Sequence, residues 1–440
     1  MFPIKTGVRQ FCLTNYYNII KQIIGASRPS HSWLLVLLLG LSACQSAIPM
    51  LHRKERQLSH LLTQSPTISS GHVGLLVTEP SKSKSLFSFS EKKLFIPAST
   101  TKILTLAECL SILGDTLSGL EFRTSGDTIF FRGTGDPCLL HPELEAYQTV
   151  FEWLKQVDTA YTLVYNPHPK APTRFGPGWA WDDYPFGFQP ERNPMPIYGN
   201  TAQVAKGVIQ PSFFANRWNN NGQKELRLEF DNQWSDHLLQ PEKSRTVPFR
   251  TDEFTALLAD TLNRTVVQGN TDTTEVGWST VPGCPTDTLY RKMMLESDNL
   301  IAEQLYWRLQ VEHPMPVGWY SPIKRVDGSG LSRYNMISPE VLCLALVELY
   351  RNQPMERIEQ LFPAGGRSGT LEKWFGNGEN PPYVFAKTGS MSGVYCLAGY
   401  IKTKKDKTLI FSFMCNNFIG SNSVLKEELR VILEYIRDKM

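Results

Sequence analysis

The stretch Ile96–Gly114, with the sequence IPASTTKILTLAECLSILG, is the most informative part of this chain. Its apolar residues predict a helix from Ser99 to Leu113, and because they lie on most of the helix faces, the helix should be buried. Ser99 and Lys102 are three positions apart, which places their side chains together on one helix face. A serine needs an adjacent base to become a nucleophile, and a lysine can be that base when its ammonium is destabilised. The stretch therefore predicts a buried helix that begins with a nucleophile and its base.

Two further motifs follow along the chain, Ser297–Asn299 (SDN) and Lys387–Gly389 (KTG). Each is a weak signal alone, since the pattern SxxK occurs at least five times and KTG occurs twice. Only Ser99, however, begins a long buried helix, and only Lys387 lies on a predicted strand ahead of the final hairpin. Together, the order SxxK, SDN, KTG is the signature of penicillin-binding proteins and class A β-lactamases.

The side chains of the later motifs complement the serine and the lysine. Ser297 can relay a proton toward a leaving amine, and Asn299 can orient a substrate amide. Lys387 is a candidate for a second cation that lowers the pKa of Lys102, because a like charge nearby disfavours an ammonium. The helix N-terminus at Ser99 also places a backbone N–H and the positive end of the helix dipole where an oxyanion would form.

The rest of the pattern predicts an α/β (α+β) fold, an antiparallel sheet flanked by helices. The predicted elements are a short helix at Gln57–Leu62, strands at His72–Val77, Leu86–Phe89, Val394–Ile401 and Thr408–Asn416, and helices at Thr286–Val311, Pro339–Asn352 and Ser423–Lys439. Residues 121–285 are rich in aromatic residues, glycine and proline, and their short alternating runs predict a mostly β insertion. The predicted helices and strands on either side of this insertion lie in residues 45–120 and 286–440.

From about residue 55 to its C-terminus, the chain resembles the class C penicillin-binding proteins, the serine DD-carboxypeptidases and DD-endopeptidases of bacterial cell-wall turnover. Besides the three motifs, the resemblance rests on the blocks Gly133–Pro137 (GTGDP), Gly178–Asp183 (GWAWDD), Asp327–Arg333 (DGSGLSR) and Lys387–Tyr400. It implies a β-lactamase/transpeptidase-like fold. In such a fold a catalytic domain of residues 45–120 and 286–440 would be split between the SxxK and SDN motifs by an inserted accessory domain or domains. We expect Asp327–Arg333 to be a tight structural turn, since two glycines in four residues suit a loop. We expect Trp179–Asp183 to serve packing within the insertion rather than catalysis.

The resemblance also implies a set of catalytic residues. Ser99 is then the acylated nucleophile and Lys102 its general base. Ser297 and Lys387 move protons and shape the electrostatic field around the serine.

A second set, implied in the same way, binds the substrate. Asn299 holds the substrate backbone, and Thr388 binds the terminal carboxylate of a D-Ala-D-Ala peptide. Gly389 and Ser390 continue this substrate-binding strand, and the N–H groups of Ser99 and Ser390 form the oxyanion hole.

These residues imply a serine peptidase that cleaves D-Ala-D-Ala stem peptides, D-Ala cross-links of peptidoglycan, or both, with β-lactams as covalent inhibitors. A β-lactamase is an alternative, but fast deacylation in class A needs a further glutamate, and Glu340 does not lie in an ExxxN pattern. A non-catalytic peptidoglycan-binding protein of the same fold is disfavoured by the intact motifs.

Composition excludes several other classes of partner. The chain has 45 Lys and Arg against 42 Asp and Glu, and a net charge of +3 is no footprint for nucleic acid. Its eight histidines show neither HxH nor HExxH spacing, so we expect no metal and no organic cofactor.

The N-terminal 44 residues predict a lipoprotein signal peptide. The apolar run Trp33–Leu41 is shorter than the roughly 20 residues that span a bilayer, and it follows a basic, acid-free segment. The ending Leu41–Cys44 (LSAC) resembles the bacterial lipobox, which would make Cys44 the lipidated first residue of the mature protein. A plain cleaved signal is the alternative. We expect a cell-envelope protein that faces the periplasm and meets the membrane only through this anchor.

The other cysteines are dispersed along the chain. Cys109 and Cys343 lie in apolar helical patterns and should be core residues. Cys396 and Cys415 lie on neighbouring predicted strands and could meet.

Overall fold

The computed structural model describes residues 53–80, 84–184, 186–206, 208–215, 245–271, 276–312, 322–376 and 381–440. The predicted signal peptide, with Cys44, lies outside these residues. The chain divides into two units, Met1–Leu58 and Ser59–Met440. Residues 53–64 form a helix, which confirms the short helix predicted at Gln57–Leu62. Within the described residues, no helix combines the length and apolar character that crossing a membrane requires.

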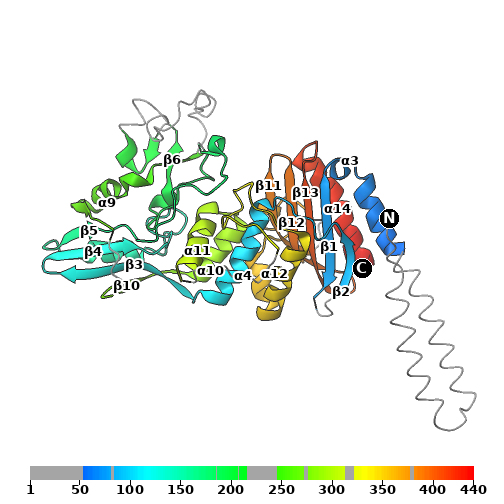
Figure 1. Ribbon diagram of the computed structural model, residues 1–440, viewed down its shortest axis with the longest axis horizontal. Helices are drawn as coiled ribbons and strands as arrows, with labels where there is room; N and C mark the ends of the chain where they lie inside the picture. Colours follow the sequence, from blue (N-terminus) through cyan, green and yellow to red (C-terminus); the bar gives the residue numbers. More distant parts are fainter. Residues whose placement is uncertain are drawn as a thin grey trace, which may run out of the picture. The chain divides into compact units, whose positions relative to one another are not determined.

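The central sheet has five antiparallel strands in the order β11-β12-β13-β1-β2 (Figure 1). Its strands are β1 (His72–Glu79), β2 (Lys84–Phe89), β11 (Val384–Met391), β12 (Val394–Lys402) and β13 (Thr408–Asn416). The first strands of the chain thus pair with its last ones, and all four strands that the pattern predicts with explicit bounds are confirmed. The KTG motif lies on β11 at the edge of this sheet.

Register decides which strand residues share a face of this sheet. Cys396 pairs with Met414, whereas Cys415 pairs with Tyr395. Because successive side chains point to opposite faces, Cys396 and Cys415 lie on opposite sides of the sheet. The expectation that these two cysteines could meet is therefore wrong.

Helices cover the sheet and build the main core. They are α3 (Pro66–Ser69), α4 (Lys102–Ile112), α10 (Thr286–Leu295), α11 (Asn299–Glu312), α12 (Pro339–Asn352), α13 (Met355–Leu361) and α14 (Asn422–Lys439). Cys109 of α4 and Cys343 of α12 are buried in the core that these helices share with the sheet, as predicted. The side chain of Ser338 accepts a hydrogen bond from the backbone N–H of Val341 and caps α12.

Two of the predicted helices are interrupted at the motifs they carry. The pattern at Thr286–Val311 is two helices, α10 and α11, separated by residues 296–298. Ser297 has a φ of 65°, which no helix accommodates, and Asp298 starts the next helix by accepting a hydrogen bond from the N–H of Ile301 at 2.9 Å. Ser99 likewise lies in a 3₁₀ turn, η1 (Ala98–Thr101), immediately ahead of α4. Both serines are thereby placed on turns rather than inside helices.

Between α4 and α10 the chain forms two smaller sheets. The first has the order β10-β3-β4-β5-β9, and the second has the order β7-β6-β8 (Figure 1). Their strands are β3 (Thr116–Ser125), β4 (Thr128–Gly133), β5 (Thr162–Tyr165), β6 (Thr201–Ala205), β7 (Val208–Gln210), β8 (Arg245–Pro248), β9 (Val266–Gln268) and β10 (Ser279–Pro285). The segment also has helices α5 (Thr149–Gln156) and α9 (Phe254–Leu262) and the short 3₁₀ turns η2 (Trp181–Asp183), η3 (Tyr198–Asn200), η4 (Ser212–Phe214) and η5 (Thr251–Glu253).

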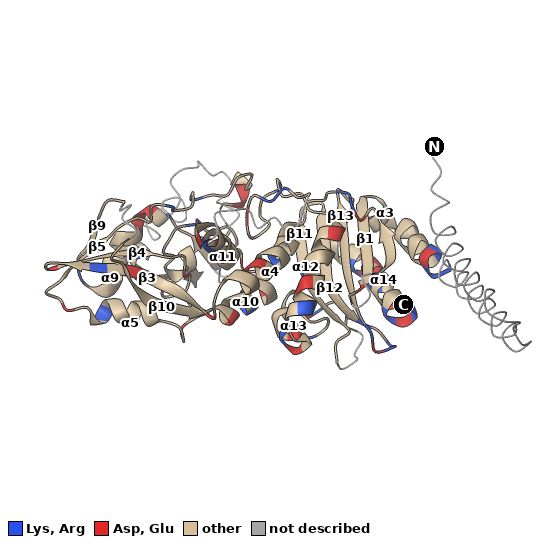
Figure 2. Cartoon of the chain, turned by 60° about the horizontal axis from the view of Figure 1, so that its bottom comes forward, with Lys and Arg blue, Asp and Glu red and all other residues tan. Residues whose placement is uncertain are grey.

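The first and last strands of this segment, β3 and β10, pair with each other, so the chain leaves and re-enters the helical core at neighbouring points. One buried carboxylate holds this junction together. Asp136 accepts the backbone N–H groups of Cys138 and Cys284, both at 2.8 Å. The sheet begins at Thr116, slightly ahead of the boundary at residue 121 that composition indicates. Acidic and basic residues are interspersed along the described helices and strands (Figure 2).

Candidate active site

The candidate nucleophile, Ser99, lies in a turn against which two other backbone segments pack closely. Each of these segments has a glycine at the point of contact. A Cβ atom on Gly389 would lie 2.4 Å from the carbonyl oxygen of Pro97, so strand β11 passes directly against this turn. Gly330 has a φ of 86°, and a Cβ there would lie 1.9 Å from the carbonyl oxygen of Ala98. Both contacts require glycine, and both bring distant segments to Ser99.

Lys102 is fully buried behind Ser99 and makes three hydrogen bonds. Its Nζ lies 3.0 Å from Ser99 Oγ, 2.6 Å from Asn299 Oδ1 and 2.8 Å from the carbonyl oxygen of Ser329. A neutral amine has two N–H donors, which the amide oxygen of Asn299 and the carbonyl of Ser329 can accept. The lone pair of the amine then faces the Ser99 hydroxyl, as a general base requires.

Burial lowers the pKa of Lys102 from 10.5 to about 8. Desolvation disfavours the ammonium, and the carboxylates of Asp298, Asp327 and Glu303 act in the opposite direction. The balance leaves a lysine that a mildly alkaline solution deprotonates.

A second serine–lysine pair lies next to the first. Lys387 Nζ donates to Ser297 Oγ at 2.9 Å and to the carbonyl oxygen of Thr388 at 3.0 Å. Lys387 is fully buried, and burial followed by the positive charge of Lys102 lowers its pKa well below 10.5. The sequence-based expectation is that a positive charge on Lys387 lowers the pKa of Lys102. The charged groups that act on Lys102 are instead three carboxylates, which stabilise its ammonium. Burial, rather than a Lys387 cation, therefore accounts for the lowered pKa of Lys102.

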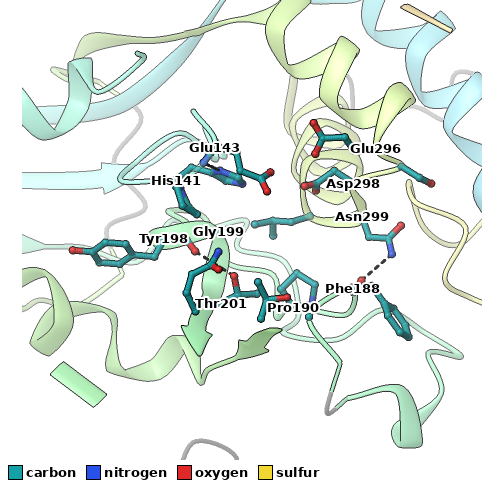
Figure 3. A pocket seen from close by; sticks show the side chains of 16 residues that line it. His141, Glu143, Phe188, Pro190, Tyr198, Gly199, Thr201, Glu296, Asp298 and Asn299 are labelled. Atoms are coloured by element: carbon teal, nitrogen blue, oxygen red, sulfur yellow. Dashed lines mark hydrogen bonds between the residues drawn. The ribbon is translucent and has the colours of Figure 1, made fainter. Parts of the chain in front are cut away.

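Asn299 joins the motifs to the insertion. Its Oδ1 accepts from Lys102, and its Nδ2 donates to the carbonyl oxygen of Phe188 at 2.8 Å (Figure 3). Phe188 belongs to the aromatic segment between Trp179 and Gln189. The amide expected to hold the substrate backbone is thus also the bridge between α11 and this segment.

Polar partners also surround the other candidate binding residues on strand β11. Thr388 Oγ1 donates to Thr370 Oγ1 at 2.8 Å. Ser390 Oγ accepts from Asn422 Nδ2 at 2.7 Å. Two threonine hydroxyls beside the lysine of KTG suit the binding of a carboxylate. Thr370, which no sequence motif indicated, lies in a short 3₁₀ turn, η6 (Gly369–Leu371).

Two buried carboxylates hold the loop behind Lys102: Asp327, which begins the predicted turn, and Glu303, which no sequence motif indicated. Asp327 accepts the N–H groups of Gly330 at 2.9 Å and Ser332 at 2.7 Å. Glu303 Oε1 accepts the N–H of Ser329 at 2.8 Å, which aims the Ser329 carbonyl at Lys102. The tight turn predicted at Asp327–Arg333 is confirmed. Glu303 lies four residues after Asn299, on the same buried face of the helix. A charged residue on an apolar helix face is the feature of the sequence that could have identified it.

The Trp179–Asp183 block differs from its expected role in packing the insertion. The indole N–H of Trp179 donates to Asp327 Oδ2 at 3.1 Å. Asp182 and Asp183 line the same cavity as Ser99, and Arg333 lies on it too. This cleft has a volume of about 580 Å³. Burial raises the pKa of Asp183, a smaller effect of Asp182 adds to it, and Arg333 opposes both.

The structure therefore brings together all of the predicted site residues that it describes. Around one cleft it places Ser99 with its lysine and a second serine–lysine pair that can carry a proton. Among the described residues, no group of three or more His, Cys, Asp and Glu side chains is arranged to hold a metal ion. Such an arrangement can transfer an acyl group to a serine, and it defines a serine peptidase of the penicillin-binding class.

Comparison with known proteins gives the family. The model of the D-Ala-D-Ala carboxypeptidase 3 (S13) family matches residues 54–223 and 321–436, so the chain belongs to this family. The matched segments include Ser99, Lys102 and Lys387, whereas Ser297 and Asn299 lie between them.

Individual relatives are distant. The chain is 24% identical to penicillin-sensitive carboxypeptidase A of Dictyostelium discoideum, over 77% of this chain and 81% of that protein. It is 28% identical to D-alanyl-D-alanine carboxypeptidase DacB of Haemophilus influenzae, but that match covers 35% of this chain and only 36% of the relative. The crystal structure of penicillin binding protein 4 (dacB) from Haemophilus influenzae shares the fold, with a TM-score of 0.63 at 20% identity, over 86% of this chain and 97% of that one.

Proposed function

We propose that this protein is a serine DD-peptidase that acts on peptidoglycan through an acyl-enzyme on Ser99. The observation that carries the proposal is the buried Lys102 amine, 3.0 Å from Ser99 Oγ and with a pKa lowered to about 8. Membership of the D-Ala-D-Ala carboxypeptidase family supports the reaction type.

Acylation begins with the neutral amine of Lys102. It takes the proton of Ser99 as Oγ attacks the carbonyl carbon of the penultimate D-alanine. The backbone N–H groups of Ser99 and Ser390 stabilise the oxyanion. The C–N bond then breaks, and the proton that Lys102 took from Ser99 passes to the leaving amine through Ser297, which Lys387 holds at 2.9 Å, so that Lys102 is neutral again.

Deacylation regenerates the enzyme. A water molecule gives a proton to the neutral amine of Lys102 as its oxygen adds to the ester carbonyl. The ester C–O bond breaks, and Ser99 Oγ recovers its proton. Glu340 does not line the cleft, although Glu296 does. Membership of the D-Ala-D-Ala carboxypeptidase family favours a peptidase over a β-lactamase.

Substrate binding follows from the strand that carries KTG. The extended peptide lies along β11, with its amide held by Asn299 and its terminal carboxylate held by the Thr388 and Thr370 hydroxyls. Gly389 lets strand β11 and the Ser99 turn approach each other. Such a site accepts a free D-Ala-D-Ala end, and also a cross-link when the leaving amine belongs to a second strand.

We also propose that the protein is anchored in the cell envelope through a lipid on Cys44 and faces the periplasm. The basic segment, the short apolar run and the LSAC ending support this proposal. Cys44→Ser should release the protein from membranes or leave it unprocessed. A mature N-terminus downstream of Cys44 in the wild type would mean an ordinary cleaved signal instead.

The activity is tested with the purified protein and muropeptides, read by mass spectrometry. Loss of D-alanine from pentapeptides, conversion of cross-linked dimers to monomers, or both are expected. A labelled penicillin should bind covalently at one equivalent, as expected of a penicillin-binding protein. Ser99→Ala should abolish both reactions. Labelling that persists in Ser99→Ala, with the adduct on another residue, would overturn the assignment.

A further inference from the structure

A second cavity adjoins the catalytic cleft at the SDN motif (Figure 3). Its volume is about 270 Å³, near the lower end of ligand pockets, which suits a single ring. It shares Phe188, Glu296, Ser297 and Asn299 with the cleft that contains Ser99. None of the roles proposed above uses the groups on its far side.

The cavity offers many hydrogen-bond acceptors. Glu143, Glu296 and Asp298 line it, and an ionised carboxylate has about four acceptor sites. The buried ammonium of Lys292 pairs with Glu143 and Glu296. Asp298 accepts the N–H of Ile301. These few donors leave most acceptor sites of the three carboxylates open to a ligand with many hydrogen-bond donors.

His141 supplies the complementary donor. It is 6% exposed, and its Nδ1 accepts the N–H of Glu143 at 3.2 Å, so its proton lies on Nε2. Nε2 has no hydrogen-bond partner among the described residues, and it faces Gly199 on the cavity wall. Burial lowers the pKa of His141, which keeps the ring neutral near pH 7 and leaves one N–H for a ligand.

Flat apolar surfaces complete the cavity. The ring of Phe188 is 47% exposed and stacks on Phe186, with centroids 5.4 Å apart and planes at 9°. Pro190 and Tyr198 also line the cavity (Figure 3). Aromatic rings beside hydroxyl-accepting groups match a pyranose, which has C–H faces and a rim of hydroxyls.

We propose that this cavity binds an N-acetylated sugar ring of the peptidoglycan strand whose peptide is cleaved at Ser99. The inference rests on the proposed function and names a carbohydrate subsite for it. Sugar hydroxyls donate to the free oxygens of Glu143 and Asp298, while the N–H of His141 meets an acetamido oxygen. A neighbouring cavity of about 560 Å³ shares His141, Tyr198 and Gln203, and offers room for a further ring.

The experiment compares a disaccharide-pentapeptide with the same pentapeptide freed of its sugars. For the wild type, the sugars should lower KM about tenfold, the effect of roughly two neutral hydrogen bonds. Gln203→Trp, which fills the cavity, should remove this difference. Glu143→Gln should reduce it about threefold, in the range of one exposed polar contact. The KM for the free pentapeptide should stay unchanged in both variants.

Matched controls isolate the cavity. Glu356→Gln alters an exposed carboxylate on α13 that lines neither cavity, and Gln268→Trp adds an indole to an exposed strand elsewhere. Both should keep the sugar effect. Folding is checked by melting temperature and by the rate of labelling with penicillin. Binding of the disaccharide to the penicillin-acylated protein, followed by NMR, gives a readout independent of turnover.

Several outcomes would overturn the inference. The subsite is wrong if the sugars do not change the wild-type KM, or if their effect survives in Gln203→Trp. Acetylating the free amine of the pentapeptide gives a further test. If this acetylation weakens binding to the wild type but not to Glu143→Gln, the cavity holds an ammonium, and the sugar subsite is wrong. Failure of the wild type to cleave either substrate would instead contradict the proposed function.

Discussion

Lys102 Nζ donates a hydrogen bond to Asn299 Oδ1 at 2.6 Å and so joins two motifs that are 197 positions apart. The same amide donates through Nδ2 to the carbonyl oxygen of Phe188. One side chain therefore links the base, the helix after the SDN turn and the rim of the inserted segment. A change at any of the three should alter the position of Lys102 relative to Ser99.

The pH dependence of acylation should depend on the carboxylate of Asp298, next to Asn299, because its charge raises the pKa of Lys102. Asp298 is the largest of the groups that raise the pKa of Lys102. Asp298→Asn removes that charge, so the pKa should fall below about 8. The reactive base is the neutral amine, and the acid limb of the rate should therefore move to lower pH. Asparagine still has an oxygen to cap Ile301.

Labelling rates with penicillin between pH 5 and 10 measure this shift. Asp182→Asn is the control, because Asp182 lines the cleft but is not among the groups that act on Lys102. An acid limb that stays in place or moves upward in Asp298→Asn would contradict the electrostatic account.

Lys102→Arg should be nearly inactive in acylation. A guanidinium stays protonated throughout the working range and cannot accept the Ser99 proton. Loss of a positioned base costs about 10²–10⁴-fold, and the larger arginine must also fit a fully buried site. Stopped-flow or gel-based labelling with penicillin gives the rate. An active variant with the wild-type pH profile would remove Lys102 from the role of base.

Lys387→Met tests the second pair. The influences on the pKa of Lys102 are burial and three carboxylates, so this variant should leave the acid limb of acylation in place. It should slow turnover, because Ser297 loses its 2.9 Å partner. It should also weaken substrates with a free terminal carboxylate more than β-lactams held by other contacts. An upward shift of the acid limb would show instead that a Lys387 cation does lower the pKa of Lys102.

Gly330→Ala should displace the turn that carries Ser99. Its Cβ would lie 1.9 Å from the Ala98 carbonyl oxygen, at a φ of 86°. Gly277→Ala is a close control, because Gly277 has a φ of 85° with nothing within 4 Å of its Cβ position. Both substitutions carry the same backbone strain, but only Gly330→Ala should reduce the penicillin labelling rate. Equal rates in the two variants would show that the close approach is not needed.

Asp327→Asn should destabilise the fold. Its carboxylate accepts the N–H groups of Gly330 and Ser332, and an amide cannot accept all of its bonds. Hydrogen bonds to charged groups contribute about 1.5–3 kcal/mol each, so the free energy of unfolding in urea should fall by roughly 3 kcal/mol. Asp406→Asn, on an exposed turn with a φ of 53°, should change it little. Equal stability of the two variants would argue against this anchor.

Local pattern was sufficient for much of this protein. Short, mostly apolar runs bounded by turn residues located strands β1, β2, β12 and β13, and β12 and β13 are apolar almost throughout because they are buried on both faces. Apolar spacing located the helix after Ser99, and the three motifs named the side chains that meet in the cleft. These features depend on residues close together in sequence, where period and chemistry can be read directly.

The geometry of the site depended on tertiary structure. The helical pattern at Thr286–Val311 continues through Ser297, yet the chain breaks there, where Ser297 pairs with Lys387 and Asp298 caps α11. No local period indicates such a break, because its cause lies on strand β11.

Long-range packing also determined the charges and the cysteines. Lys102 has a lowered pKa because distant segments bury it, and Glu303 and Asp327 act only through the loop they hold. Cys396 and Cys415 are separated by a register that pairs β12 with β13. The sequence by itself thus determined which groups take part, whereas the folded chain decided their distances, their protonation and the cavity beside them, because those depend on contacts between residues far apart in sequence.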